Sequence, residues 1–183
     1  MLKKIVVIGP ESTGKSTLCA QLARHYKTQW VPEYARAYLL KHGTNYTLED
    51  LYTIAEGQLK GEEDIINKMQ QLQSTDLSPT PVFIDTDFIV IRVWSEFVFN
   101  NCDNRILNKI ASRHYDLYLL CNTDLPWVKD ELREYPDLGT REKLYHYYKE
   151  TMTNQQVPWA EVRGTNDDRL QHAIEACEKI LHK

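Results

Sequence analysis

The sequence predicts an α/β protein of three layers, α/β/α, with helices on both faces of a mostly parallel five-stranded sheet. Short apolar runs of strand length alternate along the chain with longer segments of helical periodicity. This alternation is typical of β-α-β units and of a parallel sheet. The 183 residues suffice for one domain with a buried core, so we expect a single domain over residues 1–183. A polar segment at 122–150 interrupts the alternation, and we expect a small helical lid there.

Five segments have the character of strands. The first, KIVVI at residues 4–8, is a continuous β-branched run, typical of a strand that is buried on both faces. The other four expected strands lie at 28–31, where Pro32 ends the run, within 78–85, at 116–121 and, with a weaker pattern, at 157–162.

The helices are expected between these strands. Leu18, Leu22 and Tyr26 recur at helical spacing and predict a helix from residue 15. Residues 47–73 begin with TLED, which resembles a capping box, and continue as one or two polar helices. Residues 167–182 predict a closing amphipathic helix. In 122–150, dense in charge and tyrosine, we expect a mobile polar stretch and then a helix outside the core.

Composition narrows the classes of function. The net charge of −4 argues against a nucleic-acid scaffold, which normally carries a basic surplus. No run approaches the 18 or more apolar residues of a membrane span, and the N-terminus does not have the pattern of a signal peptide. The four cysteines are scattered, with no spacing typical of a metal site. We therefore expect a cytoplasmic protein with free thiols and with neither a nucleic-acid nor a membrane partner.

The most specific motif is GPESTGKST at residues 9–17, which fits G-x-x-x-x-G-K-[ST]. Its glycines allow backbone N–H groups to point at phosphate oxygens, and the following helix contributes the positive end of its dipole. Lys15 is expected to reach the β- and γ-phosphates and Ser16 to bind Mg²⁺. The motif predicts a P-loop NTPase fold with ATP and Mg²⁺ as cofactors. The expected nucleotide-binding residues are Gly9, Pro10, Glu11, Ser12, Thr13, Gly14, Lys15, Ser16 and Thr17.

Two aspartates follow the third expected strand, in VFIDTD. Asp85 ends the apolar run in the manner of a Walker B element, and we expect it to hold Mg²⁺ directly or through water. Asp87 has two interpretations, a cap of the helix that starts near Phe88 or a contact with a substrate.

An acid and an arginine follow the second expected strand, in VPEYAR. Ligands of open parallel sheets bind beyond the carboxyl ends of the strands, so Glu33 and Arg36 should face the phosphate site. Glu33 is a candidate for binding an acceptor hydroxyl or acting as a base, and Arg36 for neutralising developing charge. The alternative is an ion pair on a solvated helix.

The expected lid contains DLPWVKDELREYPD at 124–137. Small-molecule kinases often close an arginine-bearing lid over the nucleotide to exclude water. Arg133 and Arg141 are the candidates, with Arg133 expected to contact the nucleotide. The alternative interpretation is a charged surface helix.

Four segments, GPESTGKSTL, EYAR, FIDTDFI and PWVKDELR, occur in an order and spacing that resemble a known family. They resemble the ribosylnicotinamide (nicotinamide riboside) kinase domain of NadR-type NAD-biosynthesis proteins, and the resemblance runs from Lys4 to Leu181. It implies a P-loop kinase that transfers the γ-phosphate of ATP to the ribose 5′-hydroxyl of nicotinamide riboside, giving nicotinamide mononucleotide. There are two departures. The phosphate motif begins at residue 9, so we do not expect the family's adenylyltransferase or DNA-binding domains, and Glu131 stands where the lid motif often has glycine.

The sequence thus favours a small-molecule kinase with nicotinamide riboside as the acceptor. The alternatives are a P-loop ATPase or switch acting with a protein partner, and a nucleoside or nucleotide kinase of the same architecture. The acceptor carries a cationic ring on a ribose, which calls for carboxylates and aromatic faces. The expected catalytic residues are Lys15, Glu33, Asp87 and Arg133, with either Glu33 or Asp87 as the base for the ribose 5′-hydroxyl. The expected acceptor-binding residues are Glu33, Tyr34, Arg36, Asp87, Phe88 and Trp94.

Overall fold

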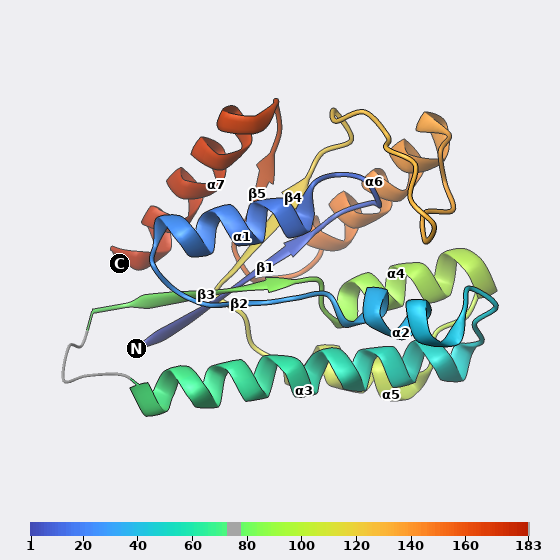
Figure 1. The fold of residues 1–183 in the computed structure, drawn as a ribbon, viewed down its shortest axis with the longest axis horizontal. Helices are drawn as coiled ribbons and strands as arrows, with labels where there is room; N and C mark the ends of the chain where they lie inside the picture. Colours follow the sequence, from blue (N-terminus) through green and yellow to red (C-terminus); the bar gives the residue numbers. More distant parts are fainter. Residues whose placement is uncertain (73–77, 183) are drawn as a thin grey trace.

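The computed structural model describes residues 1–72 and 78–182, and its five strands form one parallel sheet (Figure 1). Their order across the sheet is β2-β3-β1-β4-β5, and every neighbouring pair is parallel. The bounds of the strands are β1 Leu2–Ile8, β2 Trp30–Val31, β3 Thr80–Asp85, β4 Leu117–Cys121 and β5 Trp159–Val162. All five strands predicted from the sequence are therefore present, and the predicted fold class is confirmed.

Strand β1 is the centre of the molecule because both of its faces are covered. Ile5 and Val7 face one helical layer and Val6 and Ile8 the other, and all four are fully buried. Successive side chains of a strand point to opposite faces, so a continuous apolar run suits a strand between two layers. Helices α1 (Lys15–His25) and α7 (Asn166–Leu181) cover the first face. Helices α4 (Phe88–Phe99) and α6 (Leu138–Thr153) pack on the second (Figure 1).

Three further helices form a satellite core beside the sheet: α2 (Tyr34–His42), α3 (Leu48–Leu72) and α5 (Asn104–Ser112). The polar segment at 47–73 is a single helix, and the predicted end at residue 73 lies outside the described residues. Helix α5 was not anticipated, although Asp103 caps it by accepting a hydrogen bond from the Arg105 N–H. Among the described residues, none of these helices is both long and apolar enough to cross a membrane.

The segment 122–150 divides into two different parts. Residues 122–137, which we call the lid segment, form turns and irregular backbone and contain no helix. Helix α6 follows, and the expectation that it lies outside the core is wrong: Leu144, Tyr145, Tyr148 and Met152 are buried in the cluster on the second face of the sheet. Its tyrosines supply apolar rings that cover the sheet despite their polar hydroxyls.

Candidate active site

The phosphate loop, residues 9–14, joins β1 to α1 at the carboxyl end of the sheet. Gly9 has φ +140° and lies against β4, where an added Cβ would be 2.7 Å from the carbonyl oxygen of Cys121. Neither the backbone angle nor the space admits a side chain there. Within the loop, Thr13 Oγ1 and Lys15 Nζ both donate to the Pro10 carbonyl, at 2.7 and 2.8 Å. The loop thus has a defined shape, with Lys15 at its mouth.

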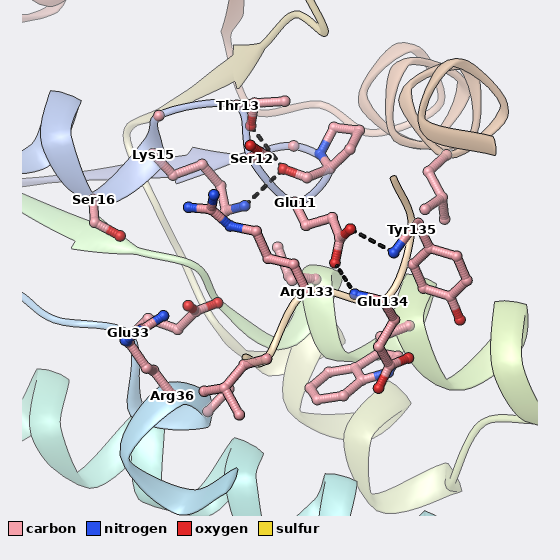
Figure 2. A pocket seen from close by; sticks show the side chains of 18 of the residues that line it. Glu11, Ser12, Thr13, Lys15, Ser16, Glu33, Arg36, Arg133, Glu134 and Tyr135 are labelled. Atoms are coloured by element: carbon pink, nitrogen blue, oxygen red, sulfur yellow. Dashed lines mark hydrogen bonds between the residues drawn. The ribbon is translucent and has the colours of Figure 1, made fainter. Parts of the chain in front are cut away.

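A cavity of about 280 Å³ opens in front of this loop (Figure 2). The phosphate loop and the start of α1 form one wall, and the start of α2 with Glu33 and Arg36 forms another. Helix α4, the lid segment and two residues of α6 close the remaining sides. Groups from five distant parts of the sequence therefore meet in one pocket, as the crevice at the carboxyl end of a parallel sheet predicts.

Glu33 lies at the N-cap of α2, yet its side chain makes no capping hydrogen bond. The N–H of Tyr34 is satisfied instead by the side-chain oxygen of Gln58 at 2.7 Å, and the amide of Gln58 donates to the carbonyl of Asp85 at 3.2 Å. Buried Gln58, on α3, therefore ties the start of α2 to the end of β3 and leaves the Glu33 carboxylate directed into the pocket (Figure 2). No sequence motif signalled this bridge.

Asp85 is fully buried, and neither carboxylate oxygen has a hydrogen-bond partner among the described groups. Burial raises its pKa to about 7, and the Glu33 charge adds to the rise, whereas Lys15 and the Ser16 hydroxyl oppose it. An unpartnered buried carboxylate is costly unless a cation joins it. Asp85 and Ser16 are suited to hold Mg²⁺, which commonly takes one or two protein oxygens together with substrate phosphates. No group of three or more possible metal ligands occurs among the described residues.

Asp87 has both carboxylate oxygens engaged. One accepts the Ile89 N–H and caps α4, and the other accepts the Tyr118 hydroxyl at 2.7 Å. Burial raises the pKa of Asp87 to about 6, against the lowering effect of these donors. Like Asp85, which lies fully buried behind Ser16 and Lys15, Asp87 is not among the residues that line the pocket. Of the two interpretations from sequence, the structure displays the cap, while the predicted contact with an acceptor gains no support from the geometry.

We expect Tyr118→Phe to lower the free energy of unfolding by about 1–3 kcal/mol, because it leaves a buried oxygen of Asp87 without its donor. Equilibrium urea denaturation measures the change. Tyr38→Phe removes a hydroxyl from Asp50 in a more exposed setting, and we expect it to change stability by less. Equal losses in the two variants would contradict the structural role of the Tyr118–Asp87 pair.

The aromatic residues predicted for the acceptor divide between the pocket and the core. Trp94 lines the pocket, but Phe88 is buried between helices and Tyr34 packs its ring over Gly57 of α3. Phe97 and Tyr135, which the sequence analysis did not select, line the pocket instead. Phe97 lies three residues after Trp94, on the same face of α4, so helical spacing was the signal that could have identified it.

The two candidate lid arginines have different positions. Arg133 lines the pocket and extends from the lid segment across it toward Lys15 (Figure 2). Arg141, on α6, is buried and donates to the backbone carbonyls of Leu125 at 3.1 Å and of Ser12 at 3.4 Å. It does not line the pocket. Arg141 therefore braces the phosphate loop and the lid segment from outside, and Arg133 is the lid cation that faces the site.

A protein-family model described as an AAA domain matches residues 4–169. The chain belongs to this AAA-domain family. It is also 24% identical, over 98% of its length, to the trifunctional NAD biosynthesis/regulator protein NadR of Escherichia coli K12 and to that of Salmonella typhimurium LT2. The match covers 43% of each relative, so the chain spans less than half of their length.

Solved structures show the same fold. A NadR protein in complex with NR superimposes with a TM-score of 0.77 at 23% identity, covering 99% of this chain and 52% of the other. NadR with NAD and AMP-PNP gives 0.72 at 24% identity, covering 99% and 50%. Thymidylate kinase from Ehrlichia chaffeensis gives 0.64 at 12% identity, covering 97% and 98%. The resemblance stated from the four sequence segments is confirmed, and this AAA domain has the fold found in P-loop kinases.

Proposed function

We propose that the protein is an ATP-dependent kinase that phosphorylates the ribose 5′-hydroxyl of nicotinamide riboside. The observation that carries this proposal is the pocket itself, in which the phosphate loop, the Glu33 carboxylate, which makes no capping hydrogen bond, and the aromatic side chains of Trp94, Phe97 and Tyr135 face one cavity. Its similarity to NadR, which has been solved with NR and with AMP-PNP, supports both the acceptor and the nucleotide.

The phosphate loop is the proposed site of the ATP phosphates. Its backbone N–H groups and the N-terminus of α1 favour anions, and Lys15 has to exchange the Pro10 carbonyl for phosphate oxygens. Ser16 and Asp85 would hold Mg²⁺, which supplies positive charge to the β- and γ-phosphates when bound. Arg133 approaches from the opposite wall and neutralises the remaining charge on the transferred group.

The acceptor binds on the side of α2 and α4. Glu33 accepts the proton of the 5′-hydroxyl while the hydroxyl oxygen forms a bond to the γ-phosphorus of ATP. The bond between that phosphorus and the bridging oxygen of the β-phosphate breaks, and ADP leaves. The faces of Trp94, Phe97 and Tyr135 suit a cationic aromatic ring, which aromatic quadrupoles attract. We assign the base to Glu33 over Asp87, because of these two carboxylates only Glu33 lines the pocket, and its side chain accepts no hydrogen bond from the described residues.

A nucleoside or nucleotide kinase is the second candidate. Thymidylate kinase and a deoxyadenosine kinase from M. mycoides share the fold, with TM-scores of 0.64 and 0.56. Both cover nearly the whole of this chain, at 12% and 13% identity. An uncharged base would stack on the same aromatic side chains, so the acceptor panel below includes neutral nucleosides and a nucleotide.

The deciding experiment offers nicotinamide riboside, uridine, cytidine, thymidine, adenosine and thymidine monophosphate separately, each with ATP and Mg²⁺, and identifies products by mass. We expect nicotinamide mononucleotide to form with the highest kcat/KM. A preference for one of the neutral nucleosides or for the nucleotide would replace this acceptor by the second candidate. Steady ATP hydrolysis with no phosphorylated acceptor would instead favour a switch that acts on a protein partner.

We expect Arg133→Ala to lower kcat by about tenfold or more while changing the Kd of ATP much less, because Arg133 meets charge that develops on the transferred group. ATP hydrolysis without acceptor should rise relative to transfer, since water is less well excluded. Steady-state kinetics with and without acceptor measure both effects. Arg24→Ala, an exposed change on α1, is the matched control. If kcat and the ratio of ATP hydrolysis to transfer are both unchanged, Arg133 does not act in catalysis and is a solvated surface residue.

A further inference from the structure

Glu11 places a negative charge inside the phosphate loop, where the proposed function puts the phosphates of ATP. The loop's N–H groups and Lys15 are arranged for anions, and a carboxylate beside bound phosphates is repelled by them. Phosphate binding therefore does not account for a glutamate at this position. Its contacts point to a different role.

The Glu11 carboxylate accepts three hydrogen bonds, and all three donors belong to the lid segment. Figure 2 shows the two that come from the backbone N–H groups of Glu134 and Tyr135. One oxygen accepts the backbone N–H of Tyr135 at 2.6 Å and the indole N–H of Trp127 at 3.1 Å. The other accepts the backbone N–H of Glu134 at 2.9 Å. Hydrogen bonds to an ionised acceptor are stronger than neutral ones, so this cluster is a firm attachment between two segments more than 110 residues apart.

The attachment lies directly beside Arg133. The two backbone groups that Glu11 holds come immediately after Arg133 in the chain. On the other side, the Val128 N–H donates to Ser12 Oγ at 3.0 Å, and the Arg133 guanidinium donates to the Val128 carbonyl. Two neighbouring residues of the phosphate loop therefore fix the lid segment on both sides of the arginine that crosses the pocket.

A second tie joins the lid segment to α2, through the two-hydrogen-bond pair of Arg36 and Asp130. The Arg36 side chain is 49% exposed in this pair. Exposed ion pairs contribute little to stability because water and salt screen them. The Glu11 cluster joins the lid segment to the phosphate loop itself, beside the Ser12–Val128 hydrogen bond and the Arg141 brace, and of these contacts with the loop it is the one that uses an ionised acceptor.

We propose that Glu11 is a positioning residue that docks the lid segment on the phosphate loop and thereby sets where Arg133 enters the pocket. This inference rests on the proposed kinase function, because it assumes that Arg133 acts on the transferred phosphate. When the lid segment moves away from the phosphate loop, the Glu11 carboxylate loses all three hydrogen-bond donors, and its negative charge repels the bound phosphates without compensation. Bound nucleotide therefore favours the docked lid segment, and by linkage the docked lid segment raises nucleotide affinity by the same factor.

Hydrogen–deuterium exchange of the full chain tests this directly, because two of the donors are backbone amides. We expect amides in residues 124–137 to exchange at least about tenfold faster in Glu11→Ala, and less so in Glu11→Gln, which keeps one acceptor oxygen. AMP-PNP with Mg²⁺ should slow this exchange in the wild type and have less effect in both variants. Peptides from β1 and β4 should be unchanged. Glu142→Gln is the control, since Glu142 is exposed on α6 and its side chain has no hydrogen bond or ion pair among the described groups.

Kinetics supply the functional half of the test. With nicotinamide riboside, Glu11→Ala should lower kcat by about tenfold while the KM for ATP changes less, and hydrolysis without acceptor should rise. If the wild type does not phosphorylate this acceptor, the proposed function fails, yet the exchange measurement still decides the role of Glu11. If both Glu11 variants fail to fold, Trp127→Phe removes one donor from the lid side and should accelerate exchange in the same residues. Exchange in 124–137 that stays at the wild-type rate in folded Glu11→Ala, or in Trp127→Phe where that variant is needed, overturns the proposal.

Discussion

Lys15→Ala is expected to leave a folded protein whose phosphoryl transfer is at least about a hundredfold slower, equivalent to about 2.7 kcal/mol of activation free energy. Lys15 stands at the mouth of the phosphate loop, where its ammonium group stabilises charge that develops between the β- and γ-phosphates. In the structure this group donates to the Pro10 carbonyl at 2.8 Å. The ammonium group is thus held at the phosphate loop before phosphate arrives, and phosphate oxygens then replace the Pro10 carbonyl as its partner.

Single-turnover measurements with saturating ATP and acceptor give the rate of the chemical step, and thermal unfolding verifies the fold. Lys60→Ala, an exposed change on α3, is the matched control and should keep wild-type rates. Because Lys15 also lowers the pKa of Asp85, its loss should weaken Mg²⁺-dependent nucleotide binding to some extent. Turnover close to wild type in Lys15→Ala would contradict the assignment of this loop as the ATP-phosphate site, and therefore the proposed kinase activity.

The sequence predicted the parts of this molecule whose signals are local. Strand β1 and the phosphate loop follow from an uninterrupted apolar run and from glycines at the positions with positive φ, Gly9 and Gly14. The sheet and its carboxyl-end crevice then follow from the alternation of strands and helices. Glu33 and Arg36 were placed at the pocket by this rule, because they follow the end of β2, and Trp94 was placed there because it lies about two helical turns along the helix that follows β3.

The contacts that the sequence did not predict join residues far apart in the chain. Gln58 connects α2 with β3, and Glu11 accepts hydrogen bonds from the lid segment. These hydrogen bonds join a side chain to the backbone of a distant segment, so they leave no periodic pattern in the sequence. The burial of α6 was missed because its core positions include Tyr145 and Tyr148, whose hydroxyls make the pattern look polar. Tyr34 was misplaced because it occupies the space that Gly57, which has no side chain, leaves on α3.

Glu33→Gln is expected to reduce kcat by about 10²- to 10⁴-fold with nicotinamide riboside, the range typical of a lost general base. The substitution keeps the size and the hydrogen-bonding reach of the side chain and removes its capacity to take up a proton. Since Glu33 makes no capping bond, the start of α2 remains held by Gln58 and the fold should be unaffected. Glu63→Gln, an exposed change on α3, controls for the loss of one carboxylate.

The split between kinetic constants separates two roles for Glu33. A base that acts only during transfer lowers kcat and leaves the KM of the acceptor nearly unchanged, whereas a residue that only binds the ribose raises KM and spares kcat. The Kd of ATP should not rise in Glu33→Gln. The Glu33 carboxylate lines the pocket, and its negative charge disfavours the nearby phosphates, so removing that charge does not weaken ATP binding. A kcat within about threefold of wild type would exclude Glu33 as the base. Asp87 is bound on both oxygens and lies away from the pocket, so that result would leave solvent to receive the proton and would require a mechanism based on positioning and charge alone.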